Sequence, residues 1–186
     1  MHGFRASTTS PLAGSRIGRV VIDFGDTAPD FSLPATLAET HPSPREGGDA
    51  GPAARTITLS QYRGHIDVLL LFYPLDWSPV CSSEHVKCVT MFPTYSSRLQ
   101  VLGISVDSVW SHRAFANAYH IPYPLLSDFQ PRGAVAQQYG VYLSDFGFAA
   151  RTAFLVDKLG RVKLVERASV PDERSLESLL SVAPSR

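Results

Sequence analysis

The chain has 186 residues, of which 44% are hydrophobic and 18% are charged, and its 17 Lys and Arg residues balance 17 Asp and Glu residues. This length and composition indicate a globular protein of one domain with a real core, and they argue against global disorder. A formal net charge of zero gives no general attraction to nucleic acid or anionic lipid. No apolar run approaches the ~20 residues of a membrane-spanning helix, so no membrane partner is expected.

Two segments differ in composition from the rest of the chain. Residues 1–22 are predicted to be a flexible N-terminal extension, because the first 20 hold three arginines, no acidic residue and no apolar stretch typical of a secretory signal. A cytoplasmic location is therefore expected, with an organellar presequence as the alternative. Residues 39–55 are rich in Pro, Gly and Ala and are interpreted as a long surface loop. The main domain is expected to cover residues 23–186.

Strand and helix patterns alternate along the main domain. The predicted strands are short and apolar and cover residues 66–73, 100–106, 124–127, 153–156 and 162–165, the last two as a hairpin. The predicted helices cover residues 79–91, 108–119, 131–138 and 172–180. The first of these helices is expected to break or kink at Pro93. This order is typical of an α/β sheet with helices on both faces and is compatible with a thioredoxin-like sheet.

The most informative segment runs from Phe72 to Cys88 and reads FYPLDWSPVCSSEHVKC. It lies where a buried strand ends and a helix begins, the edge at which open α/β sheets bind ligands. With Ser78 as N-cap and Pro79 at the first helical position, Cys81 lies beside free backbone N–H groups and the positive end of the helix dipole. That environment favours the nucleophilic thiolate. On this placement alone, a buried and inert cysteine explains the pattern equally well.

The chain has two cysteines, Cys81 and Cys88, on the same predicted helix. Seven residues of helix separate them by about 10 Å, whereas a disulfide needs Cα atoms within about 7 Å, so they can bond only if the helix unwinds. His85 shares their helical face, but three zinc-type ligands without an obvious fourth do not predict a metal site. No Cys-x-x-Cys, phosphate-binding loop or dinucleotide fingerprint is present, and no cofactor is expected.

The pattern Pro74-x-x-x-Ser78-x-x-Cys81 resembles the active-site signature Pro-x-x-x-Thr/Ser-x-x-Cys of the peroxiredoxins, which are thiol peroxidases with a thioredoxin fold. Four further stretches are similar to the family and occur in its order: Ala28–Phe31, Gly103–Ser108, Tyr123–Asp128 and Arg151–Asp157. The resemblance covers residues 24–182, and residues 124–140 look most like the AhpE-like, one-cysteine branch. It implies a thioredoxin-like fold, with a central mixed sheet flanked by helices.

The resemblance also implies a role for each matching residue of the site. Cys81 is expected to be the peroxidatic nucleophile that becomes sulfenic acid. The Ser78 hydroxyl is expected to hydrogen-bond the peroxide, and Pro74 to shield the sulfur. Arg151 is expected to stabilise the thiolate and the charge on the departing oxygen, with Glu84 orienting its guanidinium. Without the resemblance, Arg151 reads as a surface ion pair and Glu84 equally well as a solvated helix position.

The implied function is a thiol-dependent peroxidase that reduces hydrogen peroxide, organic hydroperoxides or peroxynitrite. Its reductant is expected to be an external thiol, from thioredoxin, a glutaredoxin-like protein or a low-molecular-weight thiol, and a homodimer or higher homo-oligomer is expected. Cys88 is interpreted as a small core residue; a resolving role, as in Q-type peroxiredoxins, is the alternative. A redox sensor with little turnover is a further alternative. His112 is interpreted as a residue that packs or caps its helix.

Overall fold

Residues 21–36 and 55–169 are described by the computed structural model, and within them seven strands form one mixed sheet. Its order is β2-β1-β5-β4-β3-β8-β9. The strands are β1 (Ser32–Ala35), β2 (Arg55–Thr58), β3 (Asp67–Phe72), β4 (Leu99–Ser105), β5 (Leu125–Ser127), β8 (Thr152–Val156) and β9 (Val162–Arg167). The central strands β3, β4 and β5 are parallel, and the strands on either side of them pair antiparallel.

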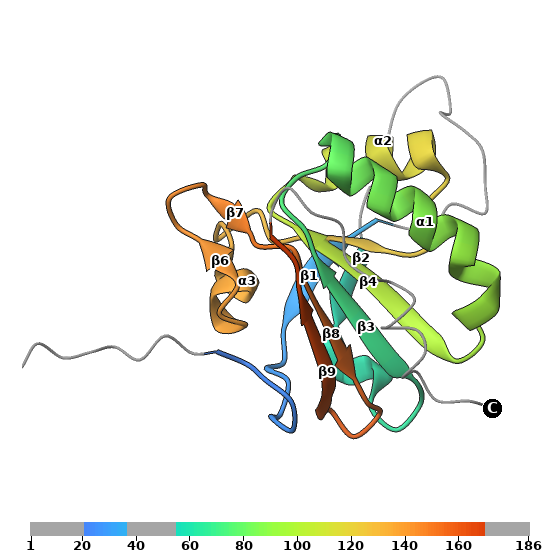
Figure 1. The fold of residues 1–186 in the computed structure, drawn as a ribbon, viewed down its shortest axis with the longest axis vertical. Helices are drawn as coiled ribbons and strands as arrows, with labels where there is room; N and C mark the ends of the chain where they lie inside the picture. The colour runs from blue at the N-terminus through green and yellow to red at the C-terminus, as the bar shows by residue number, and fades with distance from the viewer. Residues whose placement is uncertain (1–20, 37–54, 170–186) are drawn as a thin grey trace, which may run out of the picture.

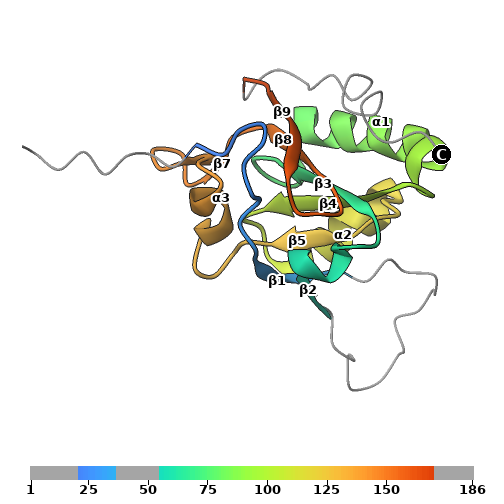
Figure 2. The same ribbon diagram turned by 90° about the horizontal axis from the view of Figure 1, so that it is seen from below.

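The helices lie on opposite sides of this sheet. They are the 3-10 helix η1 (Leu59–Tyr62) and the α-helices α1 (Pro79–Tyr95), α2 (Val109–Tyr119) and α3 (Ala134–Gln138). In Figures 1 and 2, α1 and α2 lie together, whereas α3 lies apart from them beside the small hairpin of β6 (Tyr142–Leu143) and β7 (Phe148–Ala149). The site described below lies at the end of β3 from which α1 starts.

Strand β3 is buried on both faces because it is central. Val68, Leu70 and Phe72 belong to one hydrophobic core, and Leu69 and Leu71 belong to the other. Successive side chains of a strand point to opposite faces, so a continuous apolar run is what a strand covered on both sides requires. The sequence pattern that predicted this strand therefore reflects its central place.

Most of the predicted elements are confirmed with small shifts at their ends. The hairpin of β8 and β9 is present, and Ser108 caps α2 by accepting a hydrogen bond from the backbone of Ser111 at 3.3 Å. The expected break at Pro93 is wrong, since α1 continues to Tyr95. Pro93 lies in the last turn of α1, where its missing N–H removes one hydrogen bond close to an end that frays in any case.

Other differences arise where the sequence carries little periodicity. Helix α3 starts at Ala134 rather than at residue 131, because Gly133 precedes it in a left-handed conformation with φ 67°. Strands β1, β2, β6 and β7 were not predicted. Ile22 is buried in the core and Arg55 begins β2. Residues 1–20 of the predicted extension, residues 39–54 of the predicted loop, and the helix expected over residues 172–180 lie outside the described residues.

Across the described ranges, none of the helices has the length and apolar character needed to cross a membrane.

Candidate active site

Cys81 lies in the first turn of α1, at the place the sequence predicts. Ser78 is the N-cap, with extended backbone, and Pro79 is the first helical residue. The Ser78 carbonyl accepts a hydrogen bond from the backbone of Ser82 at 2.9 Å, but within the described residues its hydroxyl makes no capping bond to the helix. The hydroxyl is therefore available to a ligand one turn from the sulfur.

Arg151 reaches Cys81 because of the register of β8 against β3. Thr152, the first residue of β8, pairs with Phe72, the last residue of β3. The residue before β8 therefore lies beside the loop that leads into α1. Arg151 Nη2 donates to Cys81 Sγ at 3.3 Å, as the peroxiredoxin resemblance implies.

The guanidinium of Arg151 is shared between the sulfur and a carboxylate. Its Nη1 donates to Glu84 Oε2 at 2.8 Å. The exposed fractions of Arg151 and Glu84 are 1% each and that of Cys81 is 0%. The surface ion pair and the solvated helix position, which the sequence alone left open, are therefore wrong: both charges are buried and paired, as buried charges must be.

This arrangement stabilises negative charge at a buried sulfur. A guanidinium remains protonated at any physiological pH, and its hydrogen bond to an ionised acceptor is stronger than a neutral one. The first turn of α1 adds backbone N–H groups and the positive end of its dipole. The site can therefore hold a thiolate nucleophile and stabilise an oxygen anion formed beside it.

Pro74 is buried at the start of the loop between β3 and α1. It follows Tyr73, which is itself wholly buried. This position is consistent with a covering role over the site, and the shielding of Cys81 by Pro74 remains a prediction.

Cys88 lies two turns further along α1 and faces the core. Its exposed fraction is 3%, and it packs in the same apolar cluster as Leu71 and Phe115. Both cysteines are free thiols. Burial, followed by the neighbouring Cys88 thiol, raises the pKa of Tyr123 well above its usual value. These surroundings are those of a core residue.

His85 does not bring the two cysteines into a metal site. Its Nδ1 lies 2.8 Å from the hydroxyl of Tyr123, and its ring packs edge-on against Tyr73 with centroids 4.6 Å apart. In the part of the chain that the structure describes, no three His, Cys, Asp or Glu side chains are grouped as metal ligands would be. The imidazole is part of an aromatic cluster beneath α1.

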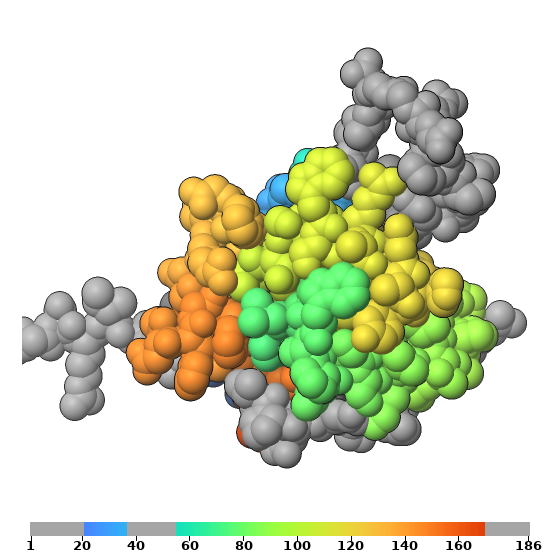
Figure 3. Space-filling view, turned by 90° about the horizontal axis from the view of Figure 1, so that it is seen from above, coloured from blue at the N-terminus to red at the C-terminus, as the bar shows by residue number. Residues whose placement is uncertain are grey.

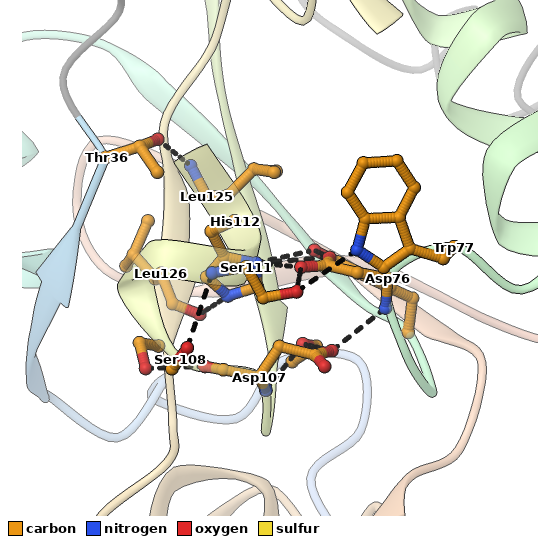
Figure 4. A network of polar contacts seen from close by, with 12 residues as sticks. Thr36, Asp76, Trp77, Asp107, Ser108, Ser111, His112, Leu125 and Leu126 are labelled. Atoms are coloured by element: carbon orange, nitrogen blue, oxygen red, sulfur yellow. Dashed lines mark hydrogen bonds and ion pairs between the residues drawn. The ribbon is translucent and has the colours of Figure 1, made fainter. Parts of the chain in front are cut away.

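A second buried ion pair beside the site was not predicted. Asp76, in the loop before α1, lies with its Oδ2 3.0 Å from His112 Nδ1, and both side chains have an exposed fraction of 0%. Figure 4 shows the two side chains at the centre of a polar network. His112 does pack on its helix, as interpreted, but it also pairs with a charge. The sequence signal that could have predicted this pair is Asp76 itself, a charged residue within the apolar segment FYPLDW.

The interactions of Asp76 keep it ionised. Burial alone would raise the pKa of its carboxyl, but the hydrogen bond and charge of His112, followed by the hydroxyls of Ser111 and Tyr73, outweigh burial. The pKa of Asp76 is therefore lowered from its usual value.

Comparison with known proteins identifies a family that contains this kind of site. The sequence profile of the AhpC/TSA family matches residues 24–165, which include Cys81 and Arg151. Alkyl hydroperoxide reductase E of Mycobacterium tuberculosis is 34% identical over 147 residues, which cover 78% of this chain and 86% of that protein. Peroxiredoxin-2 of Mus musculus is 32% identical over 164 residues, which cover 84% of this chain and 75% of that protein.

Solved structures of proteins with related names have the same fold. Mycobacterium tuberculosis AhpC superimposes with a TM-score of 0.74 at 25% identity, over 88% of this chain and 96% of that one. The reduced 2-Cys peroxiredoxin of Plasmodium vivax superimposes with a TM-score of 0.70 at 28% identity, over 86% of this chain and 79% of that one.

Proposed function

The chain belongs to the AhpC/TSA family of peroxiredoxins, and we propose that Cys81 is the cysteine through which it works. Its fold is thioredoxin-like, as predicted, and it is a thiol-dependent peroxidase. The observation that carries the assignment to Cys81 is the buried hydrogen bond of 3.3 Å from Arg151 to the sulfur. Cys88 is 3% exposed and packs in the apolar cluster beneath α1.

In the proposed reaction, the Cys81 thiolate attacks the terminal oxygen of a peroxide ROOH. The S–O bond forms as the O–O bond breaks, so the sulfur becomes sulfenic acid and RO⁻ leaves and takes up a proton. Arg151 stabilises the thiolate and then the departing oxygen, and Glu84 fixes the guanidinium for both tasks. The Ser78 hydroxyl hydrogen-bonds the peroxide, and Pro74 limits access of water to the sulfur.

We propose that an external thiol completes the cycle. The sulfenic acid condenses with the thiol to a mixed disulfide and water, and a second thiol releases reduced Cys81. Cys88 is not placed for this task, because it faces the core and stands about 10 Å along α1 from Cys81. Thioredoxin, a glutaredoxin-like protein or a low-molecular-weight thiol fits the chemistry. A cytoplasmic location is proposed because that compartment supplies such thiols.

Hydrogen peroxide, organic hydroperoxides and peroxynitrite are the proposed substrates. Each has an O–O bond that a thiolate can break with an oxygen anion leaving. The name of the mycobacterial relative, alkyl hydroperoxide reductase E, supports organic hydroperoxides in particular.

The test is the intact mass of the reduced protein seconds after one equivalent of hydrogen peroxide, with Cys88→Ser as the matched variant. A gain of one oxygen atom in both proteins is expected for the one-cysteine mechanism. Loss of two hydrogen atoms in the wild type alone would show that Cys88 resolves and that α1 unwinds. No rapid change in either protein would contradict the assignment to Cys81 and favour a sensor with little turnover.

We also propose that the protein forms a homodimer or a higher homo-oligomer. Three large apolar side chains are well exposed: Trp77 of the loop before α1 at 51%, Trp110 of α2 at 60% and Phe129, which follows β5, at 48%. Figure 3 shows the green loop before α1 reaching the surface between the yellow atoms of α2 and the orange atoms of the region around α3. Light scattering after size exclusion should give at least twice the monomer mass, and Trp110→Glu should lower it.

A further inference from the structure

The loop between β3 and α1 is held in an unfavourable backbone conformation. Trp77, which directly precedes Ser78, has φ 64°, in the left-handed region that bulky residues avoid. Such a conformation persists only where the surrounding structure determines it. This loop leads directly into α1. The contacts that hold Trp77 in this conformation therefore also position Ser78 and the Cys81 side chain.

Asp76 is the residue of this loop with the most polar contacts. Its backbone N–H donates to Asp107 Oδ2 at 2.9 Å. Its carboxylate accepts hydrogen bonds from the hydroxyl of Tyr73 at 2.9 Å and from the hydroxyl of Ser111 at 2.8 Å, and it pairs with His112. The contacts come from the residue that follows β3, from the segment after β4 and from α2, as Figure 4 shows for the last two.

Ser111 connects the Asp76 carboxylate to Trp77. Its hydroxyl oxygen accepts a hydrogen bond from Trp77 Nε1 at 3.3 Å, and the same hydroxyl donates a hydrogen bond to Asp76 Oδ2. The indole packs edge-on against Phe115 with centroids 5.3 Å apart and contacts Tyr119 at 6.3 Å. The conformation of Trp77 is therefore determined from α2, in part through Asp76.

The two ring nitrogens of His112 face different hydrogen-bond acceptors. Nε2 lies 3.1 Å from the carbonyl oxygen of Leu126 on β5, which can only accept. Nδ1 lies 3.0 Å from Asp76 Oδ2, and because the carboxylate only accepts, it is a proton on Nδ1 that joins the pair. Tyr73 and Asp107 are the other titratable groups at the pair, and β5 contributes the carbonyl of Leu126.

We propose that Asp76 and His112 are positioning residues for the peroxidase reaction. Their buried ion pair ties the loop before α1 to α2 and to β5, and it thereby holds Ser78 and Cys81 in the geometry that receives a peroxide. Neither residue touches the substrate. This inference rests on the proposed function, since it takes Cys81 as the reacting group.

The experiment compares Asp76→Asn with Asp128→Asn. Asp128 is also a buried aspartate, but it accepts hydrogen bonds from the backbones of Val135 and Ala136 at 3.1 and 2.9 Å, away from the loop. For each variant, the rate constants of Cys81 with hydrogen peroxide and with iodoacetamide are measured. Their ratio isolates the geometry that only a peroxide needs. Asp76→Asn should lower the ratio about 10- to 100-fold, as misplacement of reacting groups by a fraction of an ångström to an ångström does.

Asp128→Asn should leave the ratio unchanged, although it removes a buried charge as well. Equal ratios in the two variants would overturn the proposal. Should Asp76→Asn fail to fold, Ser111→Ala and Ser111→Thr replace it. Alanine removes the hydroxyl between Asp76 and Trp77 and should lower the ratio, whereas threonine retains the hydroxyl and should preserve it. A wild-type ratio for Ser111→Ala would equally overturn the proposal.

A second readout does not depend on peroxide chemistry. Trp77 and Trp110 are the two tryptophans of the chain, so in a Trp110→Phe background the emission reports Trp77 alone. Asp76→Asn or Ser111→Ala should increase quenching of Trp77 by acrylamide, and unchanged quenching would overturn the proposed hold on the loop. A wild type that reacts slowly with peroxide would contradict the proposed function instead. The quenching measurement would then still test whether Asp76 and His112 hold the loop before α1.

Discussion

The sulfur of Cys81, the proposed nucleophile, accepts a hydrogen bond from a guanidinium that also donates to a carboxylate in another direction. Arg151 uses Nη2 for Cys81 and Nη1 for Glu84, in surroundings from which water is excluded. A planar, permanently charged group suits this task, because its donors are fixed relative to each other. Lysine would bring the same charge but could not reproduce both contacts.

Arg151→Lys should therefore slow the reaction with peroxide while leaving the protein folded. Loss of one donor aimed at developing charge lowers rates by about 10²- to 10³-fold in well-studied enzymes. Stopped-flow measurement of peroxide consumption would check this. Arg132→Lys, at an exposed arginine that donates to the carbonyl of Gly147, is the matched control. A rate for Arg151→Lys within twofold of the control would reject the role of its guanidinium.

Ser78 allows capping and catalysis to be separated. Replacing an N-cap serine by alanine normally costs about 1 kcal/mol, because the side chain satisfies a backbone N–H. In the described part of the chain the Ser78 hydroxyl makes no such bond. Ser78→Ala should therefore change the unfolding free energy by less than about 0.5 kcal/mol, yet lower the peroxide rate, and Ser78→Thr should retain the rate. A large loss of stability with a normal rate would assign the hydroxyl to capping instead.

The parallel strands β4 and β5 approach closely beneath α1, and Gly103 makes that approach feasible. A Cβ at Gly103 would lie 2.6 Å from Leu125 Cδ2 and 3.4 Å from the ring of Tyr73. Both neighbours are wholly buried, so neither can move into solvent. The packing of the sheet at this point thus supports Tyr73 at the start of the loop before α1.

Gly103→Ala should destabilise the protein by about 1–3 kcal/mol, the range for overpacked cores. Urea unfolding of the variant and the wild type gives this difference. The double variant with Leu125→Ala should be less destabilised than the sum of the two single changes, because the clashing atom is gone. Strict additivity would show that the glycine serves the backbone of β4 rather than this contact.

The ion pair of Asp76 and His112 gives the whole molecule a defined response to acid. The pKa of Asp76 is lower in the fold than the ~3.9 of an unfolded chain. The unfolded state therefore binds the proton more readily. The stabilisation is complete above that unfolded value and is lost as the pH falls through the lower folded value.

The difference in unfolding free energy between wild type and Asp76→Asn should therefore be largest above about pH 5 and shrink below about pH 4. Asp128 provides a control of opposite sign, since burial, only partly offset by backbone N–H groups, raises its pKa. For Asp128→Asn, the wild type should lose its relative advantage as the pH rises. Urea midpoints between pH 3 and pH 7 measure both trends, and parallel curves for the two variants would contradict this assignment.

What the sequence determined by itself is the local architecture of the reacting segment. An apolar run of five residues in β3, followed by Ser78 and Pro79, specifies a buried strand and a helix start within one stretch of chain, and so places Cys81 at N3 of α1. Capping preferences and hydrophobic periodicity act over a few residues, so the sequence alone predicts elements that depend only on neighbouring residues.

The tertiary structure decided which distant groups meet at that sulfur. Arg151 is 70 residues from Cys81, and only the register of β8 against β3 brings them within 3.3 Å. His112 is likewise 36 residues from Asp76, and it reaches the loop because α2 packs beside it. Burial of these charges, and hence their pairing, depends on strands and helices closing over them. No short-range pattern encodes that closure, since its energy comes from packing between elements far apart in the chain.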